Sequence, residues 1–289
     1  MTAPDASEPD PDELRAGVRD RWERSADGWR ESSHRFNAAT NAVAHWLVDA
    51  IRPQPGMRVL ELAAGIGETG FLAAELIEPG GVLVSTDGAE PMIEHARARA
   101  AELGLRNVEF KPIDLEWIDG ATAEYDAVIC RWGYMFAVDR EAALRETRRV
   151  LRPGGRVALA TWTAADRNPW STIAREAIYE AGLIDALEHP APSPFDLSTP
   201  EIVTTLLEDT GFGEVETAEI AVEFPYADVV DLFSETKSLA RPFADLVEGL
   251  DSRQLADLRA RLVEKTAPYA LADGSFRLPG VALVAAAEA

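Results

Sequence analysis

The sequence has little cysteine and no long apolar run. Its single cysteine, Cys130, excludes a framework of disulfide bonds within the chain, which is typical of small secreted proteins. Cys130 lies in the apolar run YDAVIC, which predicts a buried thiol and fits a reducing, cytoplasmic location. No stretch approaches 18 uncharged apolar residues, so no membrane-spanning helix is expected.

Positive charge is also scarce. The 289 residues include 28 Lys and Arg against 50 Asp and Glu, which gives a formal net charge of −22. Such a charge repels phosphate backbones and anionic lipids, so neither nucleic acid nor a membrane is an expected partner. The segment MTAPDASEPDPDE at the start is acidic and proline-rich, unlike a targeting peptide, and we expect residues 1–11 to form a disordered tail.

The apolar residues that are present change their rhythm along the chain. Over residues 12–52 they recur at spacings of three, four and seven, which predicts an N-terminal cap of two or three helices. The segment RPQPGM ends this pattern. Residues 53–289 then alternate short apolar strands with amphipathic helices, which is typical of a mostly parallel sheet covered by helices.

Two helical segments interrupt the predicted sheet, near residues 164–198 and 226–270, and we expect both to cap a substrate. The first of them contains a predicted helix at 169–188. The other predicted helices are 67–78, 89–103, 139–151 and 200–210. The predicted strands are 57–62, 81–86, 107–112, 125–130, 155–163, 214–224 and 275–289.

Suggestive residues follow the first three predicted strands. Gly65 and Gly67 permit a tight turn in which a ligand could approach bare backbone at a helix start, although a turn without a ligand would also explain them. Asp87 could accept hydrogen bonds from ribose hydroxyls or cap the next helix, and Asp114 could bind an adenine amino group or occupy a turn. Because parallel strands end at one edge of a sheet, the three loops together predict a nucleotide-type site.

The run GIGETG also fits the GxGxxG pattern of NAD-dependent enzymes. In that pattern, the residue four positions before the first glycine is a buried apolar strand residue, whereas this chain has Glu61 there. The register therefore disfavours NAD. At the end of the strand, the Glu61 carboxylate could orient the ammonium group of a ligand, directly or through water.

Five segments in this order resemble the class I S-adenosylmethionine-dependent methyltransferases, particularly the branch with ubiquinone and menaquinone biosynthesis enzymes and natural-product methyltransferases. They are VLELAAGIG, VSTDGAEPMIEHARARA, KPIDLEWID, YDAVICRWGYMF and RRVLRPGGRVALATW. The resemblance covers about residues 55–165. It implies a Rossmann-like α/β fold, with a mostly parallel seven-stranded sheet, helices on both faces, an N-terminal helical cap and helical insertions.

The resemblance also implies S-adenosyl-L-methionine as the cofactor and a role for each motif. Ala63, Gly65 and Gly67 match the loop at the methionine end, where the family often has glycine in place of Ala63. WERSADGW resembles the helices that close over the cofactor, so Trp29 or Phe36 could lie near the sulfonium, or both could be core residues. The other matching positions are Asp87, Gly88 and Met92 for the ribose and adenine, Asp114 and Leu115 for the adenine edge, and Arg131 and Trp132 for the methionine ammonium.

The implied reaction needs little from the protein beyond alignment, because the methyl group of the cofactor is already activated. No catalytic triad or metal cluster is expected. An oxygen nucleophile would benefit from a general base, and the candidates are His34 in the cap and His189 in the first insertion, either of which could instead be an ordinary surface residue.

Aromatic residues in the two insertions and at the strand ends beside them predict a small, partly hydrophobic acceptor. Oxygen or carbon is favoured as the acceptor atom, because RWGYMF stands where an Asn/Asp-Pro-Pro-Tyr-type motif would indicate amino-group methylation. A non-methylating reaction such as a cyclisation, and an NAD-dependent oxidoreductase, are the alternatives. The aromatic residues that could line the acceptor pocket, or simply join helices to the sheet, are Trp162, Trp170, Tyr179, Phe195, Phe224, Phe233 and Phe243.

Overall fold

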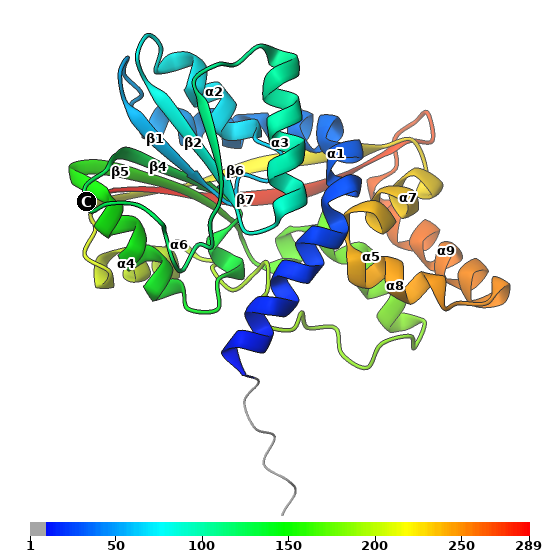
Figure 1. Ribbon diagram of the computed structural model, residues 1–289. Helices are drawn as coiled ribbons and strands as arrows, with labels where there is room; N and C mark the ends of the chain where they lie inside the picture. Colours follow the sequence, from blue (N-terminus) through cyan, green and yellow to red (C-terminus); the bar gives the residue numbers. More distant parts are fainter. Residues whose placement is uncertain (1–9) are drawn as a thin grey trace, which may run out of the picture.

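The computed structural model describes residues 10–289 (Figure 1). Most of the predicted disordered tail, residues 1–9, lies outside the described residues. Helix α1 (Pro11–Ala50) begins at the first proline that follows, and the side chain of Asp10 caps it by accepting a hydrogen bond from the Asp12 amide at 2.9 Å. The helical cap therefore starts earlier than the predicted residue 12.

The two or three helices expected in the cap are one helix of 40 residues, so this prediction was wrong. The chain has no proline between Pro11 and Pro53, and its two glycines there, Gly17 and Gly28, each cost a helix only about 1 kcal/mol. Gly28 is needed for packing, because a Cβ at that position would lie 2.0 Å from the carbonyl oxygen of Ser238. Spacing alone predicts helical residues and cannot show whether consecutive turns belong to one helix.

The predicted seven-stranded, mostly parallel sheet is confirmed. Its strand order is β3-β2-β1-β4-β5-β7-β6, and only β7 is antiparallel, to β5 on one side and β6 on the other. Three of the four strands that end beside the candidate site, β1, β2 and β4, are short and mostly buried, which is typical of a parallel sheet with both faces covered, and the edge strand β3 is partly exposed. The strands are β1 (Arg58–Leu62), β2 (Val82–Asp87), β3 (Val108–Pro112), β4 (Tyr125–Arg131), β5 (Leu151–Trp162), β6 (Gly213–Tyr226) and β7 (Phe276–Glu288).

Helices cover both faces of the sheet, as predicted. Figure 1 shows α2 and α3 on one face and α4 and α6 on the other. The helix expected at 169–188 ends at Glu180, because Gly182 takes a left-handed φ of 67° that stops it. The helices after α1 are α2 (Glu68–Leu76), α3 (Glu90–Leu103), α4 (Arg140–Val150), α5 (Pro169–Glu180), α6 (Pro200–Asp209), α7 (Val229–Leu239), α8 (Arg241–Glu248) and α9 (Ser252–Thr266).

The second insertion is helical, as expected, and consists of α7, α8 and α9. Figure 1 shows these helices grouped with α5, while α1 passes between that group and the carboxyl ends of β1 and β2. Across residues 10–289, no helix combines the length and the apolar character that crossing a membrane requires. The long α1 packs against both the sheet and the second insertion.

Candidate active site

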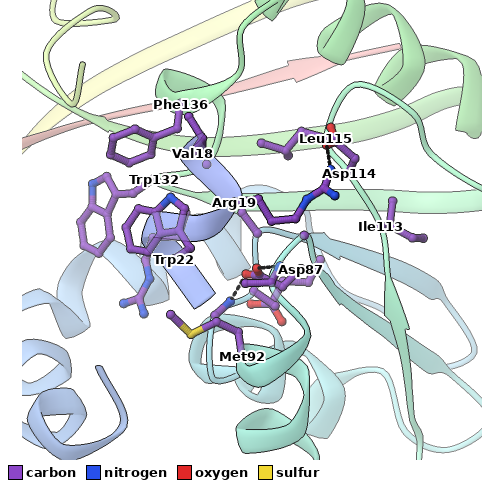
Figure 2. Close-up of a pocket in the computed structure, with 18 of the residues that line it drawn as sticks. Val18, Arg19, Trp22, Asp87, Met92, Ile113, Asp114, Leu115, Trp132 and Phe136 are labelled. Carbon is purple, nitrogen blue, oxygen red and sulfur yellow. Dashed lines mark hydrogen bonds and ion pairs between the residues drawn. The ribbon is translucent and has the colours of Figure 1, made fainter. Parts of the chain in front are cut away.

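The carboxyl ends of β1, β2, β3 and β4 meet at a cavity of about 190 Å³. β1 lies between β2 and β4, so the strand order reverses here, and open α/β sheets bind ligands at such a point. The opposite wall is α1, and Figure 2 shows side chains from both walls around the same hollow. The predicted cofactor residues that line the cavity are Glu61, Ala63, Gly65, Asp87, Gly88, Met92, Asp114, Leu115, Arg131 and Trp132.

The loop after β1 turns sharply into α2. Ala63 and Gly65 have φ angles of 49° and 56°, in the left-handed region that favours glycine, so the alanine is strained by about 1–2 kcal/mol. Gly67 is the N-cap residue of α2, and it is not among the described residues that line the cavity. A Cβ on Gly67 would lie 2.3 Å from the Phe71 ring, so packing beneath the loop already requires this glycine. Its contact with the cofactor stays a prediction.

Asp87, at the end of β2, holds two loops together. Its Oδ2 accepts a hydrogen bond from the Gly65 amide at 2.8 Å, and its Oδ1 accepts one from the Ala89 amide at 2.9 Å. Burial raises the pKa of Asp87, while these amide hydrogen bonds act in the opposite direction. The residue that caps α3 is Ala89, so the carboxylate of Asp87 lies at the junction of the two loops rather than on the end of the helix.

The third loop follows β3 and supplies Asp114 and Leu115. The Oδ1 of Asp114 accepts a hydrogen bond from the Glu116 amide at 2.9 Å, and its other oxygen lies 3.9 Å from the guanidinium of Arg19 on α1. Figure 2 shows Asp114, Leu115 and Met92 on different sides of the same hollow. The loops after β2 and β3 thus bring a carboxylate each, together with apolar side chains, to one end of the cavity.

Glu61, the residue that disfavours NAD in the sequence pattern, lies near the end of β1 and is 2% exposed. Its carboxylate accepts hydrogen bonds from the Gly70 amide at 2.7 Å and from the Ser85 hydroxyl at 3.2 Å. Burial raises the pKa of Glu61 to about 7. A Cβ on Gly70 would lie 2.2 Å from this carboxylate, so the start of α2 is built around it. Glu61 is therefore a buried polar group of the cavity wall.

Arg131 ends β4 and ties it to α1. Its guanidinium donates hydrogen bonds to Thr40 at 3.3 Å and Asn37 at 3.2 Å, and it lies 3.6 Å from the Glu68 carboxylate. Burial lowers the pKa of Arg131 and raises that of Glu68. The same guanidinium lies 4.9 Å from the ring centroid of Trp132, whose φ of 60° is strained for an aromatic residue. A buried, paired positive charge thus lies beside the exit of β4.

Comparison with known proteins identifies the family. The profile of the family described as "Methyltransferase domain" matches residues 53–211, more than half of the chain. The chain belongs to the class I S-adenosylmethionine-dependent methyltransferase family. The resemblance stated from the five sequence motifs is confirmed, and the NAD interpretation of GIGETG is not.

Individual relatives support the same assignment. The chain is 36% identical to nocamycin O-methyltransferase of Saccharothrix syringae over 117 residues, which is 40% of this chain and 42% of that protein. The chain spans about two fifths of the length of the curated relatives it matches first. The fold is similar to that of YcgJ from Bacillus subtilis, with a TM-score of 0.56, 18% identity, and 86% and 98% of the two chains covered. It is also similar to the [4+2]-cyclase SpnF, with a TM-score of 0.54, 15% identity, and 92% and 96% of the two chains covered.

An ion pair in the wall of this methyltransferase cavity was missed by the sequence analysis. The Arg15 guanidinium donates to one oxygen of Glu116 at 2.7 and 3.0 Å, and the other oxygen accepts from the Val138 amide at 2.8 Å. Glu116 lies two residues after Asp114 in the adenine motif, which was the available signal. No signal in the sequence pointed to Arg15, because only the course of α1 brings it to this loop.

The two candidate bases lie elsewhere. His34 is on an exposed part of α1, and His189 is half-buried in the segment after α5. Burial, together with the positive charges of Arg175 and Arg21, lowers the pKa of His189 to about 4. Neither histidine is among the described residues that line the cavity, so a catalytic role for them stays a prediction.

The aromatic residues of the two insertions and of the strand ends beside them do not form the expected pocket. Trp162, Phe224 and Phe243 are buried in the core, and Tyr179 is 44% exposed. Among the described residues, none from 164–198 or 226–270 lines the cavity, because α1 covers the strand ends itself. The role of the two insertions as a substrate cap stays a prediction.

Proposed function

We propose that this protein is an S-adenosylmethionine-dependent methyltransferase that transfers the methyl group directly to oxygen or carbon of a small, partly hydrophobic metabolite. The observation that carries the proposal is the convergence of the loops after β1, β2, β3 and β4 on one cavity in a chain of this family. A cytoplasmic location and a small-molecule partner, without nucleic acid or membrane, belong to the same proposal.

The residues present fit the cofactor. Asp87 offers carboxylate oxygens that can accept hydrogen bonds from ribose hydroxyls, and Asp114 can accept one from the adenine amino group, with Met92 and Leu115 as apolar neighbours. Glu61 supplies negative charge near the loop expected to meet the methionine end. The proposed set is the one predicted from sequence, namely Glu61, Ala63, Gly65, Gly67, Asp87, Gly88, Met92, Asp114, Leu115, Arg131 and Trp132.

The cofactor, when bound, supplies an activated methyl group for in-line displacement. The chain contributes position: the loops hold the donor, and α1 with the exit of β4 encloses the acceptor and excludes water. Holding two reactants in the correct geometry contributes up to about 7–11 kcal/mol to lowering a barrier. Each carboxylate that lines the cavity has a hydrogen-bonding or charged partner, so this arrangement favours an acceptor that ionises easily. His34 and His189 do not line the cavity, and a role for either as the base stays a prediction.

Replacing Asp87 tests the cofactor site. We expect Asp87→Ala to weaken S-adenosylmethionine binding about 10- to 100-fold, because hydrogen bonds to a charged group are lost, as measured by isothermal titration calorimetry. The matched control is Asp139→Ala, which removes a carboxylate that accepts from the Ala142 amide at 2.8 Å at the start of α4. Equal affinity in Asp87→Ala and the wild type would refute the site.

The alternative is a non-methylating reaction, such as a cyclisation, on the same fold. It is retained because a protein named as a [4+2]-cyclase shares the fold. Incubation with methyl-labelled S-adenosylmethionine and a panel of phenolic, quinol and glycosylated acceptors separates the two. Label in the product supports methylation, and conversion of an acceptor without label supports the alternative.

A further inference from the structure

Part of the cavity wall is aromatic. Three of its rings come from α1 and two from the segment after β4. Figure 2 shows the labelled rings of Trp22, Trp132 and Phe136 across the hollow from Asp114. The five rings belong to Trp22, Trp29, Phe36, Trp132 and Phe136.

The rings of Trp29, Phe36 and Trp132 are held in place by packing against other aromatic rings. Phe36 is 5% exposed and has ring neighbours on several sides, with centroids 4.9 Å away for Trp29 and 5.1 Å away for Trp132. Trp132 is stacked on Trp162, with centroids 4.6 Å apart and planes 7° from parallel. The faces of these rings largely contact other rings, so they leave little surface on which a ligand could stack.

Trp22 and Phe136 are at the end of the aromatic cluster. Their centroids are 5.3 Å apart and their planes meet at 72°, so the two rings form a corner. Both are half-buried, and the only ring neighbour of Phe136 within the described residues is Trp22. An edge-to-face pair of this kind can admit a third ring that stacks on one member and meets the edge of the other.

The corner adjoins the loops of the proposed cofactor site. Trp22 packs against a small apolar cluster formed by Ile66 from the loop after β1 and by Ala89 and Met92 after β2. A ring held in the corner would therefore lie beside the bound methyl donor.

We infer that Trp22 and Phe136 determine specificity by stacking a planar aromatic acceptor beside the methyl donor. The inference rests on the proposed function and narrows its acceptor class from partly hydrophobic metabolites to flat aromatic ones. Trp22 and Phe136 are specificity-determining residues in this scheme, with no part in binding the cofactor.

Two probes of matched skeleton test the inference: planar 2-naphthol and its saturated counterpart decahydro-2-naphthol. Their affinities are measured by calorimetry with and without S-adenosylhomocysteine. We expect the wild type to bind 2-naphthol more tightly, and Trp22→Leu and Phe136→Leu each to lose about 3- to 10-fold of that preference, as expected for one aromatic contact. Affinity for S-adenosylhomocysteine should change less than about twofold, well under the tenfold effect of one lost hydrogen bond to a charged group.

Matched controls are Trp46→Leu, on the far part of α1, and Phe110→Leu, on β3, neither of which lines the cavity in the described residues. Equal wild-type affinity for the two probes overturns the inference, and so does an equal loss in the control variants. Loss of S-adenosylhomocysteine binding in Trp22→Leu and Phe136→Leu would assign the corner to the cofactor instead. Failure of the wild type to bind S-adenosylhomocysteine at all would refute the proposed function itself.

Discussion

Glu61 is a carboxylic acid enclosed at the end of β1, and its burial makes it sensitive to pH. The pKa of Glu61 is raised from 4.5 to about 7, chiefly by desolvation, with hydrogen bonds from Gly70 and Ser85 and the charge of Arg131 opposing the shift. A carboxyl whose pKa is higher in the folded state binds more protons there than in the unfolded state. The folded protein therefore loses stability as the pH rises from about 4.5 through 7.

Glu61→Gln removes this titration while keeping the shape of the side chain. The free energy of unfolding of the wild type, relative to Glu61→Gln, should fall by about 2–3 kcal/mol between pH 5 and pH 8. Urea unfolding of both proteins at each pH measures the difference, so that other titrating groups cancel. Glu102→Gln, at an exposed position of α3, is the control and should show no such trend. A wild-type to Glu61→Gln difference that is constant across this range would contradict the account.

At the scale of elements, α1 determines the character of the site. Its first half brings Arg15, Arg19 and Trp22 to the cavity, and its middle brings Trp29 and Phe36. The periodicity of the sequence predicts which residues are helical. It does not predict that the turns form one rod across the strand ends, because that depends on how the helix packs on α2, α3 and α7.

The two glycines of α1 should respond oppositely to alanine. Gly28→Ala places a Cβ 2.0 Å from the Ser238 carbonyl oxygen of α7, so we expect a loss of about 1–3 kcal/mol despite the better helix propensity of alanine. Gly17→Ala is the matched control, because nothing lies within 4 Å of its added Cβ, and it should gain up to about 1 kcal/mol. Thermal or urea unfolding measures both. Stabilisation by Gly28→Ala would show that α1 and α7 are not packed this closely.

For the whole molecule, the sheet was predictable and the cavity only in part. Short apolar runs between amphipathic helices predict the strands, and parallel strands place Asp87 and Asp114 at one edge, as observed. Trp22 and Phe136 were not predicted as neighbours, since more than a hundred residues separate them and their contact depends on the path of α1. The insertions were expected at the cavity because they interrupt the sheet, yet a continuous α1 already occupies that position.

A buried polar cluster joins α1 to β6 and the second insertion. Arg35 donates to Asp231 at 2.8 Å, lies 3.6 Å from the 8% exposed carboxylate of Glu235 and covers the ring of Tyr226. Burial raises the pKa of Glu235. Removing Arg35 leaves this carboxylate enclosed without a positive partner, and that is more costly than losing the ion pair as a whole.

Arg35→Met should therefore lower the free energy of unfolding by about 2–4 kcal/mol. This loss is smaller than that expected for a fully buried ion pair, because the Arg35 side chain is one-third exposed. The double variant Arg35→Met, Glu235→Leu should recover part of this loss, because it removes the unpaired charge. The control, Arg30→Met, affects an exposed pair with Glu31 on the same helix and should change stability by less than about 0.5 kcal/mol. A double-mutant cycle by urea unfolding measures the coupling, and additive effects of the Arg35 and Glu235 changes would show that α1 and the insertion are not joined through this charge pair.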